Sequence, residues 1–318
     1  MRPQADILTI TLNPAVDVAT HVPAVIAGPK LRCAAPQYDP GGGGVNVARA
    51  VQKLGGAAQA LVAVGGPMGQ RLVTLLAAEG VPALPIVVSG ETRQSFAVTD
   101  DATGAQYRFG VPGEHLTVKD ADRLLTEIAA HTTPNSYVVI SGSVAPGLPE
   151  DMQSRIIAIA AEKHARVVVD TSGRALDRLI KDPTTPLHLL RIDQQEASEA
   201  ANHPMDTLND SVAFAADLVA RDVAEIIVTG RGAEGSVLVS RDQRLVCHAP
   251  QVAVRSKIGA GDAFVGAMTL ALARGSTADA ALKWGVAAAS ATVSTEATAL
   301  CDLAQAQACY DQCRIEAL

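Results

Sequence analysis

Short, nearly continuous apolar segments alternate with amphipathic ones along most of this 318-residue chain. The segments "DILTITLNP", "AQALVAVG", "SYVVISGS", "ARVVVDTSG" and "AEIIVTG" are typical of strands that are buried on both faces. Between them, "GQRLVTLLAAEG" and "PEDMQSRIIAIAAEKH" are typical of helices. This alternation predicts an α/β fold, in which helices cover a mostly parallel sheet.

Two segments do not follow this alternation of strands and helices, at about residues 16–38 and about residues 90–112. Both alternate apolar and polar residues and contain turn signals, as half-exposed antiparallel strands do. We expect them to be neighbours in space and to form a small sheet over one edge of the main sheet. No linker demands separate folding units, so residues 1–318 are expected to form one domain.

The charge and cysteine content exclude some classes of protein. A net charge of -7 argues against a protein whose main role is to bind nucleic acid or an anionic membrane, since clustered Lys and Arg favour binding to both. The five cysteines have no framework or CxxC spacing, which fits a reducing cytoplasm. No signal segment and no apolar run near the roughly 20 residues of a membrane span is evident. We therefore expect a cytoplasmic protein.

The segment "IGAGDAFVGAM" places Gly259, Ala260 and Gly261 directly before Asp262 at the start of a predicted helix. An Asp at this position can simply cap the helix. Unobstructed N–H groups at a helix N-terminus also form an anion site, with the carboxylate beside it. Both interpretations remain open from this segment alone.

Four consecutive glycines precede another predicted helix, in "PGGGGVNVARA" at residues 40–50. Glycines are entropically costly to order, so a structural turn would rarely need so many. Backbone that lies against a hydroxyl-rich ligand would benefit from them. Asn46 offers both a donor and an acceptor, which suits a sugar hydroxyl. We favour a binding site here over a local helix cap.

Other candidates follow strands at the edge where ligands collect in parallel sheets. They are Asn13 and Asp17, the segment 141–147, Asp170, and the segment 230–235. The last of these, "GRGAEG", matches the dinucleotide fingerprint GxGxxG, but a predicted β-hairpin follows where that motif requires a helix. The Walker pattern is missing from the sequence, so a nucleoside triphosphate would be bound without a P-loop.

Four basic residues lie in the two segments that are predicted to form the small sheet, at about residues 16–38 and 90–112: Lys30, Arg32, Arg93 and Arg108. On a strand, Lys30 and Arg32 would point to the same face, where they could clamp a dianionic phosphate. Taken singly, each is an ordinary solvated charge.

These segments resemble the PfkB, or ribokinase-like, sugar kinases. "GGGGVNVARAVQKLGG" is similar to the family's N-terminal signature and "GAGDAFVGAM" to its C-terminal signature, and the order of motifs agrees over nearly the whole chain. "KLRC", "TRQ" and "AQYRF" are similar to the minor bacterial 6-phosphofructokinase isozyme, with 1-phosphofructokinase and tagatose-6-phosphate kinase as relatives. The resemblance implies a three-layer α/β/α domain with a β-sheet lid that often dimerises, and MgATP as the phosphoryl donor.

The resemblance also implies roles for individual residues. Asp262 would be the catalytic base, and Gly259, Ala260 and Gly261 the anion hole. The sugar hydroxyls would be held by Asp17, Gly42, Gly43 and Asn46, and the phosphate of the sugar by Lys30, Arg32, Arg93, Arg108 and Ser143. ATP would be bound by Asp193, Thr229, Gly232, Gly235 and Lys257, and Mg²⁺ by Glu196 and Asp193 through water.

Four positions differ from the family pattern. "RIDQQE" places Arg191 and Asp193 where the family has "KPNxxE", Lys257 replaces a Thr or Ser, and Gly230 replaces a Ser or Thr. Lys257 could offset the added charge of Asp193. The resulting expectation is ATP-dependent phosphorylation of a hexose phosphate, with fructose 6-phosphate first and fructose 1-phosphate or tagatose 6-phosphate as alternatives. A sugar-phosphate-binding protein with an impaired nucleotide site is the alternative from another class.

Overall fold

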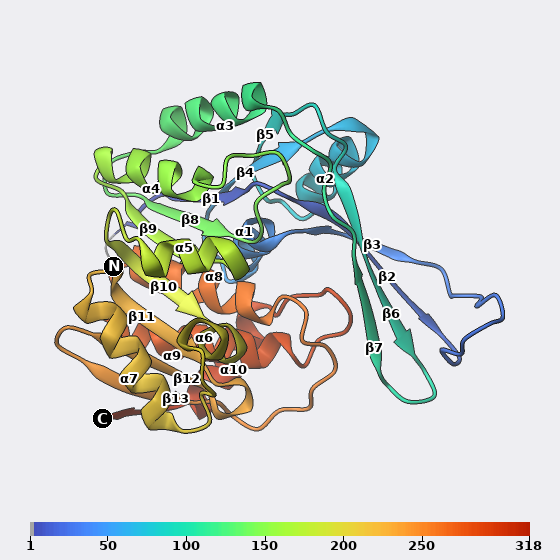
Figure 1. Cartoon of the computed structure of the whole chain (residues 1–318). Coiled ribbons are helices and arrows are strands. Elements are labelled where there is room, and N and C mark those ends of the chain that lie inside the picture. The colour runs from blue at the N-terminus through green and yellow to red at the C-terminus, as the bar shows by residue number, and fades with distance from the viewer. Residues whose placement is uncertain (1–2) are drawn as a thin grey trace.

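A ten-stranded sheet with helices on both faces forms the body of the computed structural model, which describes residues 3–318 (Figure 1). Its spatial order is β14-β13-β12-β11-β10-β9-β8-β1-β4-β5, and neighbours from β11 to β5 run parallel. The mostly parallel sheet confirms the predicted fold class. The strands are β1 (Ile7–Thr11), β4 (Gln59–Val64), β5 (Ala83–Val87), β8 (Tyr137–Ser141), β9 (Arg166–Asp170), β10 (Leu187–Ile192), β11 (Ala224–Gly230), β12 (Ser236–Ser240), β13 (Arg244–His248) and β14 (Arg314–Ala317).

Two apolar clusters fill the space between this sheet and its helices. Alternate residues of a strand point to opposite faces, so Leu189 packs in one cluster and Leu190 in the other. One cluster packs against α1, α2, α8, α9 and α10, and the other against α3 to α7. The helices are α1 (Gly43–Lys53), α2 (Gly66–Ala78), α3 (Val118–His131), α4 (Met152–Glu162), α5 (Gly173–Lys181), α6 (Gln194–Ala201), α7 (Leu208–Ala220), α8 (Ala260–Ala273), α9 (Ala278–Thr292) and α10 (Leu303–Gln312).

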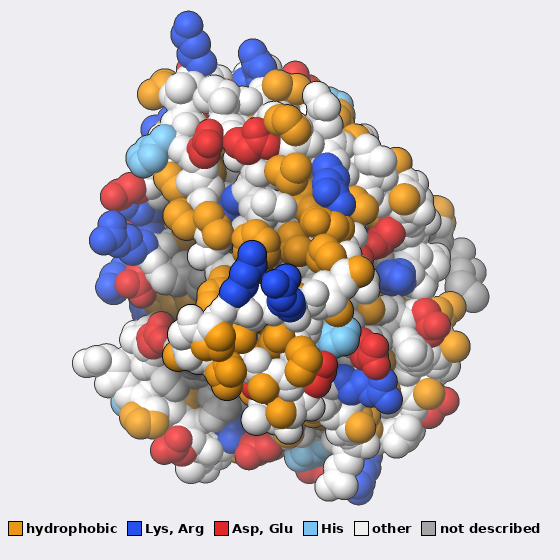
Figure 2. All heavy atoms as spheres, turned by 90° about the vertical axis from the view of Figure 1, so that its right-hand side faces the viewer, with side chains coloured by type: hydrophobic (Ala, Val, Ile, Leu, Met, Phe, Trp, Pro, Cys, Tyr) orange, Lys and Arg blue, Asp and Glu red, His pale blue; other side chains and the backbone are white. Residues whose placement is uncertain are grey.

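A separate four-stranded sheet projects from one side of the body (Figure 1). It is called the lid below and consists of β3 (Gln37–Gly41), β2 (Ala15–Val22), β6 (Arg93–Asp100) and β7 (Gln106–Gly110), in that spatial order. The outer pairs are antiparallel, as predicted, but the central pair of β2 and β6 is parallel. Hydrophobic side chains, with Lys and Arg among them, gather on the face of the molecule on that side (Figure 2).

The prediction that Lys30 and Arg32 share a strand face is wrong. Both lie in the exposed loop between β2 and β3. This loop contains Pro23, Pro29 and Pro36, which have no N–H group to donate to a neighbouring strand. The chain therefore leaves the lid after β2 and returns only at β3.

The turn after β11 leads into a hairpin. A short 3-10 helix, η1 (Gly232–Glu234), connects β11 to the antiparallel strands β12 and β13, which confirms the predicted hairpin after "GRGAEG". Among the described residues, no helix is long and apolar enough to cross a membrane.

Candidate active site

A cavity of about 190 Å³ lies between the lid and the edge of the large sheet. Strand β1 ends at this edge and continues directly into lid strand β2, so the carboxyl end of the parallel sheet faces the lid. Eight of the predicted site residues line the cavity: Asp17, Gly42, Gly43, Asn46, Arg93, Arg108, Gly259 and Asp262. They come from both lid and body, which makes the cavity a place where a small molecule would be enclosed.

Asp262 does not cap its own helix. It lies in the first turn of α8, whose N-cap receives no side-chain hydrogen bond. Its carboxylate instead accepts a hydrogen bond from Nδ2 of Asn46 at 2.9 Å and lies 3.5 Å from the Ser141 hydroxyl. Burial, together with the negative charge of Asp170, raises the pKa of Asp262 to about 7. A carboxylate with this pKa can accept a proton near neutral pH.

The turn before Asp262 separates two cavities. Gly259 begins α8 in the left-handed conformation, with φ of 76°, and a Cβ there would lie 2.6 Å from Leu300. Gly259 and Asp262 line the cavity under the lid, whereas Ala260 and Gly261 line a second cavity of about 370 Å³. Because the first N–H groups of a helix have no intrahelical acceptor, this turn presents donors where the two cavities meet.

The second cavity has the character of a nucleotide site, with one apolar wall and a polar end. Its apolar lining comes from Val254, Phe264, Val286, Ala289 and Val293, and its polar lining includes Arg191, Lys257 and Ser290. Gly230, Gly232 and Gly235 also line it, so the turn after β11 contributes to its wall. Two residues predicted to bind ATP do not line it: Thr229 is buried in β11, and Asp193 lies at the start of α6.

The four consecutive glycines are required by the fold itself, contrary to the expectation that a turn would rarely need so many. A Cβ on Gly41 would lie 2.3 Å from the Asp17 carboxylate, and one on Gly43 would lie 2.3 Å from the Ser141 hydroxyl. Gly42 has φ of 109°, and Gly44 packs against the backbone of β1. Gly42 and Gly43 also line the lid cavity, so close packing and site formation coincide here.

Charged groups of the lid converge on Asp17. Burial raises the pKa of Asp17 to about 6, while the positive charges of Arg49 and Arg93 act against this shift. The Arg93 guanidinium donates to the carbonyl oxygens of Asn13 and Val111, which fixes it at the cavity wall. Arg108 is exposed and lies opposite Ala97 in the lid register.

Three predicted phosphate ligands lie outside this cavity. The Ser143 hydroxyl accepts a hydrogen bond from Nδ2 of Asn13 at 3.1 Å and does not line the cavity. Lys30 and Arg32 lie on the exposed loop 23–36. Neither of them lines the cavity.

The segment "RIDQQE" ends β10 and begins α6. Asp193 and Glu196 form a reciprocal cap, in which each carboxylate accepts the backbone N–H of the other residue at 2.8 Å. Burial raises the pKa of Glu196 to about 7, and the charges of Asp193 and Asp170 add to this effect. No ion pair joins Lys257 to Asp193 among the described residues.

Arg191 differs from the family segment "KPNxxE", and the sequence predicts no role for it in the site. Its guanidinium lines the second cavity and contacts Asp170 at 3.3 Å. It also lies 3.1 Å from where a Cβ on Gly261 would be. Its position at the end of a parallel strand is the signal that could have found it.

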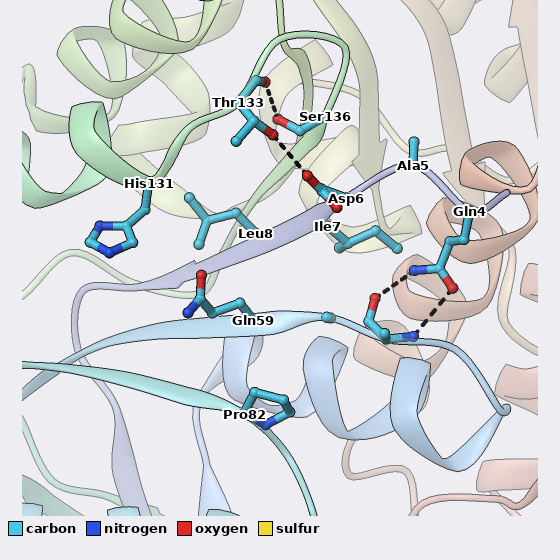
Figure 3. Close-up of a pocket in the computed structure, with 12 residues that line it drawn as sticks. Gln4, Ala5, Asp6, Ile7, Leu8, Gln59, Pro82, His131, Thr133 and Ser136 are labelled. Carbon is cyan, nitrogen blue, oxygen red and sulfur yellow. Dashed lines mark hydrogen bonds between the residues drawn. The ribbon is translucent and has the colours of Figure 1, made fainter.

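A further cavity, of about 450 Å³, lies at the opposite edge of the sheet, at the amino ends of β1, β4 and β8 (Figure 3). Its polar groups bond to one another: Thr133 donates to Asp6, Ser136 to the Thr133 carbonyl, and Gln4 to the Ala57 carbonyl. Ligands of parallel sheets collect at the other edge, so this cavity is not the candidate active site.

A buried carboxylate and a helix N-terminus between a cation-lined cavity and a nucleotide-like cavity define a class of protein, the kinases that phosphorylate a hydroxyl group. The family model described as "pfkB family carbohydrate kinase" matches residues 7–305. The chain therefore belongs to the pfkB family of carbohydrate kinases and is a sugar kinase.

Individual relatives agree with this assignment. The ATP-dependent 6-phosphofructokinase isozyme 2 of Mycobacterium tuberculosis is 38% identical over 297 residues, covering 93% of this chain and 86% of that protein. The 1-phosphofructokinase of Xanthomonas campestris is 30% identical over 266 residues, or 83% of each chain. The crystal structure of phosphofructokinase-2 from Escherichia coli in complex with fructose-6-phosphate matches with a TM-score of 0.91 and 35% identity, covering 97% and 99% of the two chains.

Proposed function

We propose that this kinase transfers the γ-phosphoryl group of ATP to the 1-hydroxyl of fructose 6-phosphate, producing fructose 1,6-bisphosphate and ADP. The observation that carries the proposal is the turn 259–262, which lies between the two cavities. The cations Arg93 and Arg108 in the lid cavity suit an acceptor that already carries a phosphate. The similarity to a phosphofructokinase-2 crystallised with fructose-6-phosphate supports the same acceptor.

In this proposal Asp262 accepts the proton of the attacking hydroxyl. Asp17, Asn46 and the backbone of Gly42 and Gly43 hold the other sugar hydroxyls. The N–H groups of Gly259, Ala260 and Gly261 neutralise charge that develops on the transferring phosphoryl group. Phosphoryl transfer leaves little covalent chemistry to the protein, so alignment and charge neutralisation supply most of the rate enhancement.

Mg²⁺ would be held at the start of α6. Asp193 and Glu196 each use one carboxylate oxygen for the reciprocal cap, which leaves the second oxygen of each for a hydrated cation. No cluster of three or more metal-binding side chains occurs among residues 3–318. Mg²⁺ is commonly bound by one or two carboxylates together with waters and substrate phosphates. The cation would neutralise the charge on the triphosphate.

A substrate panel tests which acceptor is used. ADP release with MgATP would be measured on fructose 6-phosphate, fructose 1-phosphate, tagatose 6-phosphate and unphosphorylated fructose. The proposal predicts the highest kcat/KM on fructose 6-phosphate and negligible turnover of fructose. Preference for fructose 1-phosphate or tagatose 6-phosphate would reassign the acceptor. Binding of a sugar phosphate without any nucleotide binding would replace the kinase with a binding protein.

We also propose a homodimer formed through the lid, in a cytoplasmic enzyme. The lid register places Phe96 beside Phe109 and Val98 beside Tyr107, so these side chains share one face of the sheet. Phe109 is 54% exposed and Tyr107 40%. Hydrophobic side chains gather on the face of the molecule from which the lid projects (Figure 2). A second copy would cover this face. The five thiols are free, which fits a reducing compartment.

Sedimentation tests the dimer. Phe109→Asp introduces a charge into the exposed apolar face, so it should shift the chain from dimer to monomer at micromolar concentration. The matched control is Val118→Asp, on another exposed apolar side chain, which lies in α3 outside the lid. A monomeric wild-type chain in the presence of substrate would contradict the proposal.

A further inference from the structure

Arg49 is a buried cation that touches neither cavity. It lies in α1, one turn after Asn46, and only 2% of it is exposed. Its Nε and Nη2 donate to the two carboxylate oxygens of Glu79 at 2.8 and 2.7 Å. Its Nη1 donates to the Pro40 carbonyl at 3.0 Å and to Oδ1 of Asn46 at 2.9 Å. A buried guanidinium with this many partners holds its neighbours in defined orientations.

The contact with Asn46 decides which way its amide faces. A guanidinium only donates hydrogen bonds, so the Asn46 oxygen must point toward Arg49. The Asn46 nitrogen then points to Asp262, to which it donates at 2.9 Å. A flipped amide would bring its N–H groups against the guanidinium and its oxygen against the carboxylate. Both contacts would be repulsive, so Arg49 permits one orientation.

A continuous chain of hydrogen bonds therefore joins the end of α2 to the start of α8. It runs from Glu79, the C-terminal residue capping α2, through Arg49 and Asn46 to Asp262. We propose that Arg49 is a positioning residue for phosphoryl transfer, which locks the Asn46 amide so that Asp262 presents its carboxylate to the sugar hydroxyl. This inference rests on the proposed function, in which Asp262 is the base.

The relay has a consequence for ionisation, since a hydrogen bond from Asn46 favours the charged form of Asp262. The other groups that act on Asp262 are the charges of Asp170, Arg191 and Asp17 and the hydroxyl of Ser141. None of these depends on the Asn46 amide. If the amide is released, the pKa of Asp262 is expected to rise, and activity should be lost at higher pH than in the wild type.

Arg49→Lys tests the relay. The ammonium keeps the charge but cannot hold Glu79 with two donors and Asn46 with a third in one plane. We expect kcat to fall by about tenfold or more, with both KM values nearly unchanged, and the acid limb of the pH profile to move up by about one unit. Glu79→Gln, which leaves Arg49 in place, should shift the limb in the same direction by less. The control is Arg71→Lys in α2, whose guanidinium stacks on Tyr38.

The outcomes separate the relay from a purely structural role. A loss of kcat with an unmoved acid limb in both variants would overturn the relay, and so would wild-type kcat in Arg49→Lys. If Arg49→Lys does not fold, the acid limb of the pH profile of Glu79→Gln alone tests the relay. Wild-type protein that phosphorylates no hexose phosphate would overturn the proposed function instead, before any variant is compared.

Discussion

At the scale of single residues, the sequence predicted several of the side chains that line the cavity under the lid, but not all of their positions. Asp262, Asn46 and Asp17 were found because polar residues follow strands or begin helices at the ligand-binding edge. Arg49 escaped notice because a charge inside a helix is typical of a solvated face, and its partner Glu79 lies 30 residues away. Lys30 was misplaced because alternation persisted through a proline-rich loop.

Arg93 offers a prediction at this scale. Its guanidinium is fixed at the wall of the lid cavity by the carbonyl groups of Asn13 and Val111. Arg93→Gln should raise KM for fructose 6-phosphate by about tenfold or more, since a charge-assisted contact to phosphate contributes about 1.5–3 kcal/mol, and leave KM for MgATP nearly unchanged. Arg178→Gln, in an exposed ion pair with Glu150, is the matched control. Equal effects on both KM values would contradict this placement.

At the scale of elements, apolar periodicity predicted the parallel strands β1, β4, β8, β9 and β11 and the helices α1, α2, α4 and α8, but not the parallel strands β5 and β10. It was weakest for β10 and α6, because a six-residue strand runs into an eight-residue helix with one fully buried residue, Ala197. The need for four glycines could not be derived from the sequence. It arises where α1, β1, β2 and the loop after β8 approach within contact distance.

Gly43→Ala tests this close approach. The new methyl group would lie 2.3 Å from the Ser141 hydroxyl and 2.7 Å from the backbone nitrogen of Gly142, and backbone cannot move aside cheaply. We expect the free energy of unfolding in urea to fall by about 1–3 kcal/mol, the usual effect of overpacking. Gly110→Ala is the control, because nothing lies within 4 Å of a Cβ there. Equal stability of the two variants would show that the turn relaxes freely.

At the scale of the whole molecule, the site is assembled from distant parts of the chain. The lid cavity combines residues of β2, α1, β6, β7 and α8, and the second cavity adds β10, the turn after β11, and α9. Burial raises the pKa values of three carboxylates: Asp17 to about 6, and Glu196 and Asp262 to about 7.

These three carboxylates make the stability of the ligand-free protein depend on pH. Between about pH 4 and 7 the folded state holds protons that the unfolded state releases, so the free energy of unfolding should rise as pH falls from 8 to about 5. The pKa of Asp120 is lowered to about 2, so its ionised form stabilises the folded protein, and this stabilisation should be lost only at more acid pH. Urea unfolding at pH 8, 7, 6 and 5 measures this, and Asp262→Asn should show a weaker dependence. Constant or falling stability toward pH 5 would contradict the raised pKa values.

The most direct test of the central claim is the pH dependence of ADP release from MgATP and fructose 6-phosphate, in wild type and in Asp262→Asn. The account predicts wild-type kcat/KM that falls about tenfold per pH unit below about pH 7, as a base with that pKa requires. The variant should lose about a hundredfold or more in kcat while still binding the sugar phosphate, because only the proton acceptor is removed. A variant that keeps wild-type kcat would contradict the role of Asp262.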